Sequence, residues 1–310
     1  MINQKPVART ILGVLLLALL LCGGLDLAVA APVAASNEAA SSAGATPPAV
    51  VPHGRVYLFR GALGPIFSRG MDRLTERLEQ AGITADVYEF TICRIIAAGA
   101  IREYRENPEP IILIGHSMGG FCALIFSEML EAENIRVSLV VTIDPPQVSP
   151  DVPLNIERYI NIFLSKSVLG GSHMKPKQGY RGHYASFDLS EHEEVSHINI
   201  EKTDAIQEQL VSKVVQLATT PARAEGEALP LNYVVPPKAA IELWDSGMPV
   251  FARPGDSLQT IAAFYHVPLW SITQVNKAAD NVPLVPGERV VVPRHLVPLA
   301  EVSGQPPSKR

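Results

Sequence analysis

Cysteine and charged residues are both scarce in this sequence of 310 residues. Its three cysteines are too few for a disulfide scaffold or a four-cysteine zinc site. The charged share is only 18% and the net charge is −5, so no basic footprint would recruit nucleic acid. Hydrophobic residues reach 47%, which favours a buried core and argues against a wholly disordered chain.

Part of the hydrophobic excess lies at the N-terminus. Residues 1–30 combine a short basic start, an apolar run over 11–22 and a small-residue cleavage site at 28–30, which is the pattern of a secretory signal peptide. The alternative is an uncleaved membrane anchor, because the apolar stretch could span a bilayer if Asp26 were tolerated. The strongly apolar part is only about a dozen residues long, so cleavage and export are favoured.

Shifts in composition along the chain predict its domain organisation. A stretch of Ala, Ser, Pro and Val is typical of a spacer, and a later region rich in Ala, Pro and Glu is typical of a linker. The segments expected beyond the signal peptide are a disordered spacer at 31–53, an α/β domain at 54–219, a Pro/Ala-rich linker at 220–248, a small compact module at 249–295 and a flexible tail at 296–310.

Within 54–219, short apolar runs alternate with stretches of helical periodicity. The run at 111–114 is apolar at every position, as expected for a strand buried on both faces. Such alternation predicts an α/β fold, a parallel sheet with helices on both faces and right-handed crossovers. The expected strands are 56–59, 85–90, 111–114, 139–143, 159–164 and 184–189, and the expected helices are 71–78, 95–104, 121–130 and 206–217.

Residues 115–119, Gly-His-Ser-Met-Gly, fit the pattern G-x-S-x-G between an expected strand and an expected helix. A strand-to-helix turn this tight needs glycine two residues on either side of the serine, and it holds the serine Oγ out over the end of the sheet. The following helix points the positive end of its dipole at the same place. Ser117 is therefore the predicted nucleophile, against the alternative of an incidental serine in a Gly-rich turn.

A serine nucleophile needs a base and an orienting carboxylate, and in this arrangement the chain order is Ser, then Asp or Glu, then His. Asp144 directly follows the expected strand 139–143 and is therefore expected at the same sheet edge as Ser117. It is the favoured acid, although Asp-Pro also starts turns. The competing acids are Asp188, Asp151 and Glu157.

The base is expected on a loop between the last strand and a closing helix. His197 fits this place, because residues at helical spacing follow it. His192 is the rival on the same loop, but it stands among glutamates, where a solvated histidine is the commoner case. His116, beside the nucleophile, is expected to pack and hydrogen-bond locally.

The developing oxyanion needs two preorganised N–H donors. One is expected to be the backbone N–H of Met118, at the start of the helix. The other is expected from the loop after the first strand, where Gly61 would let the backbone approach the substrate, so Ala62 is favoured and Leu63 is next. This loop has neither the dinucleotide-binding nor the Walker spacing, and the sequence contains no metal cluster and no cofactor motif.

With these features, the segment from 54 to about 217 resembles the α/β-hydrolase superfamily. The resemblance rests on the Gly-His-Ser-Met-Gly-Gly turn, the order of strands and helices, and the chain order of the candidate triad. It implies hydrolysis of an ester, a thioester or a related acyl compound through an acyl-enzyme. The segment has no long insertion that could form a lid, which weakens a reading as an interface-activated lipase, and the fold alone does not name the substrate.

The C-terminal module resembles a LysM domain, a small βααβ unit that binds glycans containing N-acetylglucosamine. The resemblance rests on the Pro-Gly-Asp-Ser-Leu start, the Trp-x-Ile and Val-Asn of the second helix, and the Pro-Gly-x-x-Val-x-Val-Pro ending. Trp270 could be a sugar platform, but a core aromatic is favoured. The resemblance places the glycan against Gly255, Asp256, Ser257, Leu258, Val282, Pro283 and Leu284.

These features together predict an exported serine hydrolase, periplasmic or extracellular, held at peptidoglycan or a chitin-like glycan by its LysM module. Its substrate would be a small acyl ester, in a specific version an O-acyl group on cell-wall or envelope glycan. No nucleic-acid partner is expected, and a membrane partner is expected only if the signal segment stays uncleaved. Two alternatives remain. One is a non-catalytic wall-binding protein with a degenerate hydrolase domain, and the other is a secreted thioesterase or lipase with LysM as an anchor. Cys93 and Cys122 are expected to be free thiols.

Overall fold

The computed structural model describes residues 53–62, 64–219, 225–280 and 282–299. The expected signal peptide, nearly all of the expected spacer and most of the expected tail lie outside these residues. None of the helices within the described ranges is long and apolar enough to cross a bilayer. Cys93 and Cys122 are both buried and both free.

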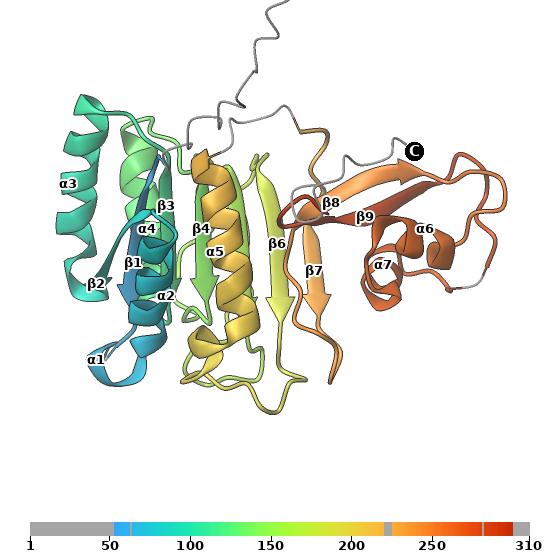
Figure 1. The fold of residues 1–310 in the computed structure, drawn as a ribbon, viewed down its shortest axis with the longest axis horizontal. Coiled ribbons are helices and arrows are strands. Elements are labelled where there is room, and N and C mark those ends of the chain that lie inside the picture. Colours follow the sequence, from blue (N-terminus) through green and yellow to red (C-terminus); the bar gives the residue numbers. More distant parts are fainter. Residues whose placement is uncertain (1–52, 63, 220–224, 281, 300–310) are drawn as a thin grey trace, which may run out of the picture. The chain divides into compact units, whose positions relative to one another are not determined.

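A seven-stranded sheet, in the order β2-β1-β3-β4-β5-β6-β7, forms the body of the protein (Figure 1). Every neighbouring pair of strands is parallel, so all carboxyl ends share one edge, the lower edge in Figure 1. The predicted α/β fold is therefore confirmed. The strands are β1 (Arg55–Arg60), β2 (Thr84–Glu89), β3 (Ile111–His116), β4 (Leu139–Ile143), β5 (Arg158–Phe163), β6 (His183–Asp188) and β7 (Leu231–Val234).

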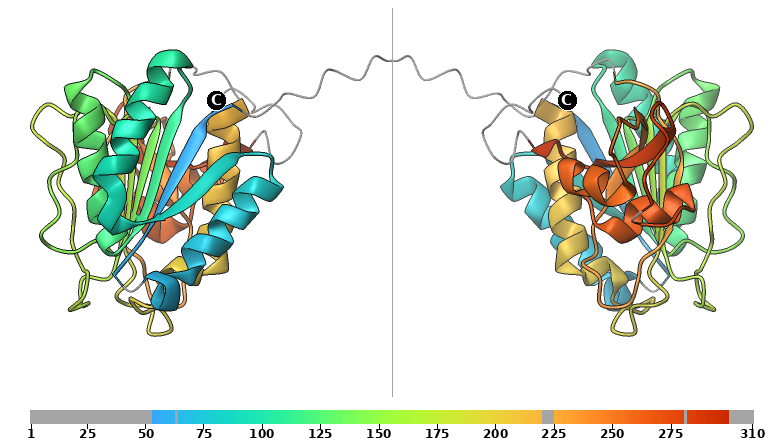
Figure 2. Two further views of the ribbon diagram at one scale, coloured as in Figure 1. Left: turned by 90° about the vertical axis from the view of Figure 1, so that its left-hand side faces the viewer. Right: turned by 90° about the vertical axis from the view of Figure 1, so that its right-hand side faces the viewer.

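Helices cover both faces of this sheet, as Figure 2 shows in its side views. On one face α2 (Arg69–Gln80) and α5 (Asp204–Thr219) contribute to a core that includes Leu58 of β1. On the other face α3 (Cys93–Glu106) and α4 (Met118–Ala132) pack with the neighbouring residue Phe59. Successive residues of a strand point to opposite faces, so β1 contributes to both cores. The short elements are α1 (Gly64–Phe67) and the 3₁₀ turns η1 (Phe90–Ile92) and η2 (Ile200–Lys202).

The expected linker carries part of the sheet. Strand β7 pairs in parallel with β6, from Ala185 opposite Leu231 to Asp188 opposite Val234. Its burial alternates along only four residues, a pattern too short to stand out among the surrounding prolines and alanines. The sheet therefore ends one strand beyond the last strand expected from the sequence.

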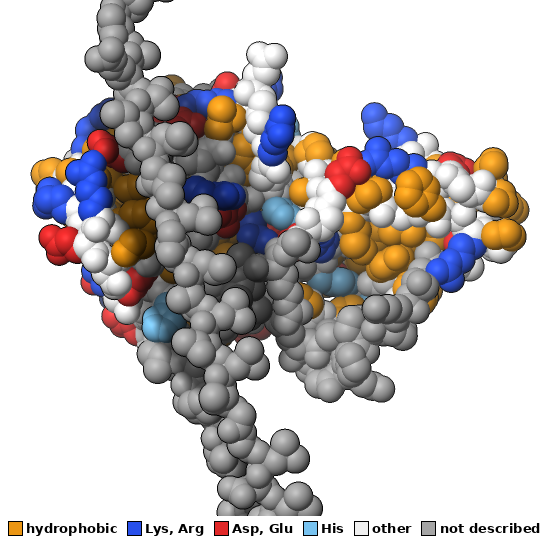
Figure 3. Space-filling model, turned by 90° about the horizontal axis from the view of Figure 1, so that it is seen from above, with side chains coloured by type: hydrophobic (Ala, Val, Ile, Leu, Met, Phe, Trp, Pro, Cys, Tyr) orange, Lys and Arg blue, Asp and Glu red, His pale blue; other side chains and the backbone are white. Residues whose placement is uncertain are grey.

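The C-terminal module is a two-stranded antiparallel sheet with two helices between its strands. Figure 3 shows apolar side chains gathered over the surface of this module. The helix α6 begins after Ser257, whose side chain forms a reciprocal capping box with Thr260. Its elements are β8 (Trp244–Phe251), α6 (Leu258–Tyr265), α7 (Leu269–Asn276) and β9 (Arg289–His295).

Aromatic side chains join the module to the sheet. Trp270 of α7 lies with its ring centroid 5.5 Å from that of Tyr233 in β7 and 5.5 Å from that of Trp244 at the start of β8. The side chain of Gln274 accepts a hydrogen bond from the backbone N–H of Val234 and donates one to its carbonyl. Trp270 thus packs in an aromatic cluster, in line with the favoured reading as a core residue rather than a sugar platform.

Candidate active site

Ser117 lies in the turn between β3 and α4, with φ of 54° and ψ of −124°. Such a conformation is strained for a residue with a side chain and persists only where the surroundings enforce it. The glycines on either side have steric reasons. A Cβ on Gly115 would lie 2.1 Å from the carbonyl oxygen of Gly119, and a Cβ on Gly119 would lie 2.1 Å from that of Phe59.

Asp144 follows β4 directly, at the same sheet edge, and it also has a positive φ of 45°. Its carboxylate is fully buried. Oδ1 accepts hydrogen bonds from the backbone N–H groups of Leu164 and Gly171, at 3.1 and 2.8 Å. Oδ2 is left for one further partner, Nδ1 of His197, at 2.6 Å.

The structure brings Asp144, rather than its rival Asp188, to the histidine. Asp188 Oδ1 accepts hydrogen bonds from the backbone N–H groups of Ser165 and Ser190 and from the Ser190 hydroxyl. Burial alone would raise the pKa of Asp188, but these hydrogen bonds outweigh it and lower the pKa. Its described contacts thus hold the loops beside β5 and β6 together.

His197 lies on the loop between β6 and η2, and the exposed fraction of its side chain is 15%. Its Nδ1 faces Asp144, which leaves Nε2 as the ring atom able to take a proton from a nucleophile. The rival His192 has its Nδ1 2.9 Å from Glu194 Oε1 and is buried. Of the two histidines, the structure therefore pairs His197 with the candidate acid.

His116 and Ser68 were not assigned to the site by the sequence, but they contact it directly. The ring centroid of His116 lies 4.9 Å from that of His197, and its Nε2 lies 2.8 Å from the His197 carbonyl oxygen. Its Nδ1 lies 2.8 Å from Ser68 Oγ. The adjacency of His116 to Ser117 was the available signal, whereas no sequence pattern indicates Ser68, which comes from the start of α2.

The candidate oxyanion donors surround Ser117 from two sides. Met118 is the first residue of α4, where a backbone N–H has no acceptor within its helix. Ala62 is exposed on the loop after β1, while Leu63 lies outside the described residues. Gly61 packs against Ser117, the candidate nucleophile, because a Cβ there would lie 2.8 Å from Ser117 Cβ. Its own N–H is donated to Ser68 Oγ, at 3.1 Å.

The residues expected to bind glycan form two adjacent loops of the C-terminal module. The backbone N–H of Leu284 donates to the carbonyl of Asp256, at 2.9 Å, and so joins the loops. Gly255 has a φ of +86° and open space around its Cα, whereas Leu258 is buried in the module's own core. Ser257 caps α6, Val282 is exposed, and Pro283 lies between Val282 and Leu284.

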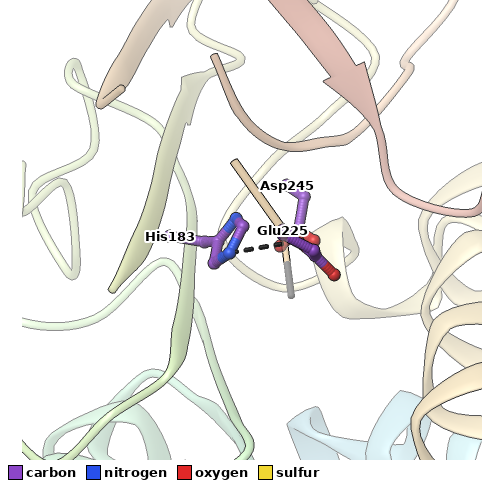
Figure 4. Close-up of side chains that lie close together, drawn as sticks. All are labelled: His183, Glu225 and Asp245. Carbon is purple, nitrogen blue, oxygen red and sulfur yellow. Dashed lines mark ion pairs between the residues drawn. The ribbon is translucent and has the colours of Figure 1, made fainter. Parts of the chain in front are cut away.

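One group of described side chains has metal-ligand chemistry, namely His183, Glu225 and Asp245, whose ligand atoms lie within 4.8 Å of one another (Figure 4). The dashed contact in Figure 4 joins His183 Nε2 and Glu225 Oε2 at 3.1 Å. The carboxylates already have cationic partners. Asp245 Oδ2 lies 2.9 Å from Lys213 Nζ and 3.1 Å from Arg158 Nε. Repulsion from these cations disfavours a divalent ion, and the group acts as an ion-pair cluster.

A parallel sheet with helices on both faces, and a serine, a carboxylate and a histidine at its carboxyl edge, define the class of the α/β hydrolases. In agreement, residues 80–216 match the family model described as the PGAP1-like alpha/beta domain, and residues 252–293 match the LysM domain. The chain thus combines an α/β-hydrolase domain with a LysM domain, as the sequence predicted. No curated protein matches the sequence.

Several solved structures are similar to parts of the chain. A protein of the α/β hydrolase superfamily from Xanthomonas campestris pv. campestris is 17% identical, with a TM-score of 0.28, and the match covers 40% of this chain and 76% of that one. A structure from work on the metagenome-derived lipolytic enzymes LipS and LipT is 20% identical, with a TM-score of 0.24 and coverage of 34% and 51%. The NocB thioesterase domain, in covalent complex with a fluorophosphonate nocardicin G analogue, is 14% identical, with a TM-score of 0.26 and coverage of 60% and 86%.

Proposed function

We propose that this protein is an exported serine hydrolase that cleaves carboxylic esters or thioesters through an acyl-enzyme. The observation that carries the proposal is the contact of 2.6 Å between His197 Nδ1 and Asp144 Oδ2, at the same sheet edge as the strained residue Ser117. An imidazole held in this way presents its other nitrogen as a general base.

In the proposed reaction, Ser117 Oγ attacks the acyl carbonyl carbon while His197 Nε2 takes the hydroxyl proton. The carbonyl oxygen becomes an oxyanion, which accepts hydrogen bonds from the N–H groups of Met118 and Ala62. Collapse of this intermediate expels the alcohol or thiol, which leaves with the proton from His197. Water then attacks the acyl-serine and loses a proton to His197. The second intermediate collapses, His197 returns the proton to Ser117 Oγ, and the carboxylic acid is released. Asp144 orients the ring of His197 and stabilises the imidazolium in both steps.

Exposed aliphatic side chains near the triad support an apolar acyl group. Lys202 Nζ donates to the carbonyls of Phe67 and Ile198, which brings the loop after β1 beside the loop of the base. On the acid's side, Leu169 precedes Gly170, which lies against the Asp144 carboxylate. The large exposed apolar side chains on these loops are Ile66, Phe67, Val168, Leu169 and Ile198. They favour the secreted lipase or thioesterase version of the function over removal of short O-acyl groups from cell-wall glycan.

The signal-peptide pattern and the LysM domain support export and attachment to a GlcNAc-containing glycan, of which peptidoglycan is the proposed form and chitin the related one. A single LysM module is expected to bind weakly, so tethering serves mainly to raise the enzyme's local concentration. The competing function is a wall-binding protein with an inactive hydrolase domain. The contact between Asp144 and His197 favours the enzyme, because an inactive domain has no need of an oriented imidazole.

Activity-based labelling tests the catalytic proposal. A fluorophosphonate probe should label the wild-type protein at Ser117, and Ser117→Ala should lose both the label and all esterase activity. Ser190→Ala is the matched control, because Ser190 is a serine near the same sheet edge whose hydroxyl contacts Asp188 instead. A wild-type protein that neither takes the probe nor hydrolyses any ester would establish the non-catalytic alternative.

A series of p-nitrophenyl esters, thioesters and acetylated glycans tests the substrate class. We expect kcat/KM to rise from acetyl to acyl groups of six to eight carbons, roughly tenfold per 1.4 kcal/mol of added apolar contact. Leu169→Ser should flatten this rise, while Val285→Ser, an equally exposed aliphatic in the LysM domain, should not. A preference for acetylated glycan would instead select the deacylase of cell-wall sugars.

Glycan attachment is tested with the mature chain rather than the isolated module, since Trp270 would lose its packing partners in the fragment. The protein should sediment with insoluble peptidoglycan, and Val282→Asp should weaken this binding. Val168→Asp, a fully exposed valine of the hydrolase domain, is the control. Equal sedimentation of both variants would contradict the assignment of the glycan-binding loops. No sedimentation of the wild type would contradict the proposed binding to peptidoglycan.

A further inference from the structure

Three hydrogen bonds form a relay beside the candidate triad. The backbone N–H of Gly61 donates to Ser68 Oγ at 3.1 Å, Ser68 Oγ lies 2.8 Å from His116 Nδ1, and His116 Nε2 lies 2.8 Å from the carbonyl oxygen of His197. It joins the loop after β1, the start of α2, the end of β3 and the loop of the base. Ser68 and His116 are both buried, so water does not compete for these bonds.

The direction of each hydrogen bond in this relay follows from the acceptor-only carbonyl of His197 and from the neutral state of the His116 ring. The carbonyl oxygen of His197 can only accept, so Nε2 of His116 carries a proton. Burial, followed by the nearby ring of His197, lowers the pKa of His116 to about 4, so the ring is neutral and Nδ1 has no proton. Nδ1 therefore accepts from the Ser68 hydroxyl, whose oxygen in turn accepts from Gly61. Each donor in this relay is thus matched with an acceptor.

We propose that Ser68 and His116 are positioning residues, which hold the loop of the catalytic base and the oxyanion loop in register on either side of Ser117. This inference rests on the proposed function. The imidazole of His197 is held at Nδ1 by Asp144, a contact about which the ring and its loop could still shift. The bond from His116 fixes the backbone of the base itself, and it does so from the residue covalently next to the nucleophile.

The other end of the relay holds the loop that carries the candidate oxyanion donor Ala62. Gly61 lies directly against Ser117, and Ala62, the candidate oxyanion donor, is the next residue. With its N–H tied to Ser68, Gly61 cannot turn without breaking the relay. The relay therefore gives the base and the oxyanion donor a common reference point, as catalysis requires of groups that must act on one carbonyl within a fraction of an ångström.

His116 does not serve as a second base. Its Nε2 proton is engaged with the His197 carbonyl and its Nδ1 with the Ser68 hydroxyl, so neither nitrogen is available to Ser117. A purely structural role in the core is the alternative that the experiment must separate from positioning.

The test uses the mature chain with a soluble ester, and it measures kcat, KM, the rate of fluorophosphonate labelling and the midpoint of urea unfolding. His116→Leu removes both ring contacts. We expect kcat and the labelling rate to fall about 10- to 100-fold with KM within about twofold, the range that a small misplacement of reacting groups causes. His116→Gln, whose amide N–H can reach the His197 carbonyl, should recover most of the loss. Ser68→Ala should lower kcat and the labelling rate less than His116→Leu does.

His192→Leu is the matched control, because His192 is an equally buried histidine on the base's loop that takes no part in the relay. It should leave kcat unchanged. Positioning is overturned if His116→Leu folds and keeps kcat within twofold, or if His116→Gln loses as much activity as His116→Leu in step with stability. If His116→Leu does not fold, an unchanged kcat in both Ser68→Ala and His116→Gln overturns it. Absence of labelling and hydrolysis in the wild type instead rejects the proposed function, and the positioning role falls with it.

Discussion

Asp144 Oδ2 accepts from His197 Nδ1 at 2.6 Å while its other oxygen is held by two backbone N–H groups. Asp144→Asn puts an amide where the imidazole needs an acceptor, which favours the wrong tautomer of His197. We expect kcat to fall by about 10⁴-fold with little change in KM, as for a displaced triad acid. Steady-state kinetics on a soluble ester and circular dichroism for the fold check this.

Asp188→Asn is the control for that change. Asp188 holds loop N–H and hydroxyl groups and has no described contact with His197, so its substitution should cost stability more than kcat. A larger loss of kcat in Asp188→Asn than in Asp144→Asn would reverse the assignment of the acid.

The close approach of Gly61 to Ser117 predicts that a larger residue at position 61 lowers activity. The missing Cβ of Gly61 would lie 2.8 Å from Ser117 Cβ, a separation that side-chain carbons do not adopt, so Gly61→Ala must displace Ser117 or the loop that carries the candidate oxyanion donor Ala62. We expect kcat to fall about 100-fold and the free energy of unfolding to fall by about 1–3 kcal/mol, because Gly61 is buried and the added methyl group overpacks its surroundings. Gly226→Ala, with nothing within 4 Å of the new methyl, should match the wild type in both measurements. Full activity of Gly61→Ala would show that this loop is not part of the site.

Sequence periodicity predicted most of the sheet because its parallel strands are buried runs such as 111–114, which pattern alone distinguishes from the amphipathic helices around them. Strand β7 escaped prediction because it is an edge strand of four residues, whose pairing with β6 and aromatic cover by Trp244 are non-local. Similarly, chain order was enough to nominate Ser117, Asp144 and His197. Ser68 enters the site only through tertiary packing, which leaves no local signature.

The buried ring of His116 predicts a pH effect on stability. Its pKa is lowered by burial to about 4 in the folded protein, against about 6.5 when unfolded. The unfolded state therefore binds the proton more tightly than the folded state. The contribution of the neutral His116 ring to folding stability is complete above pH 6.5 and is lost as pH falls towards 4. The loss amounts to about 3 kcal/mol. Urea unfolding at pH 7 and pH 5 should show that the free energy of unfolding decreases less for His116→Gln than for the wild type. An equal decrease in the two proteins would contradict a neutral buried ring.

Asp245 predicts how the hydrolase and LysM domains depend on each other. It is fully buried at the start of β8, and although burial would raise its pKa, Lys213 of α5 and Arg158 of β5 outweigh that effect and lower it. Asp245→Asn leaves the buried Lys213 without a counter-charge and leaves Arg158 paired with Glu225 but not with Asp245, so we expect unfolding to become easier by about 3–5 kcal/mol at pH 7.

Because the folded pKa of Asp245 lies below its unfolded value of about 3.9, the stabilisation is present above that pH and is lost as pH falls through the folded pKa. The difference between wild type and Asp245→Asn should therefore be constant from about pH 5 to 8 and shrink below about pH 4. Glu225→Gln is the control, since its carboxylate is about one third exposed and should cost less than about 1 kcal/mol. A loss confined to the LysM domain, with the hydrolase domain unfolding as before, would show that the two domains are energetically separate.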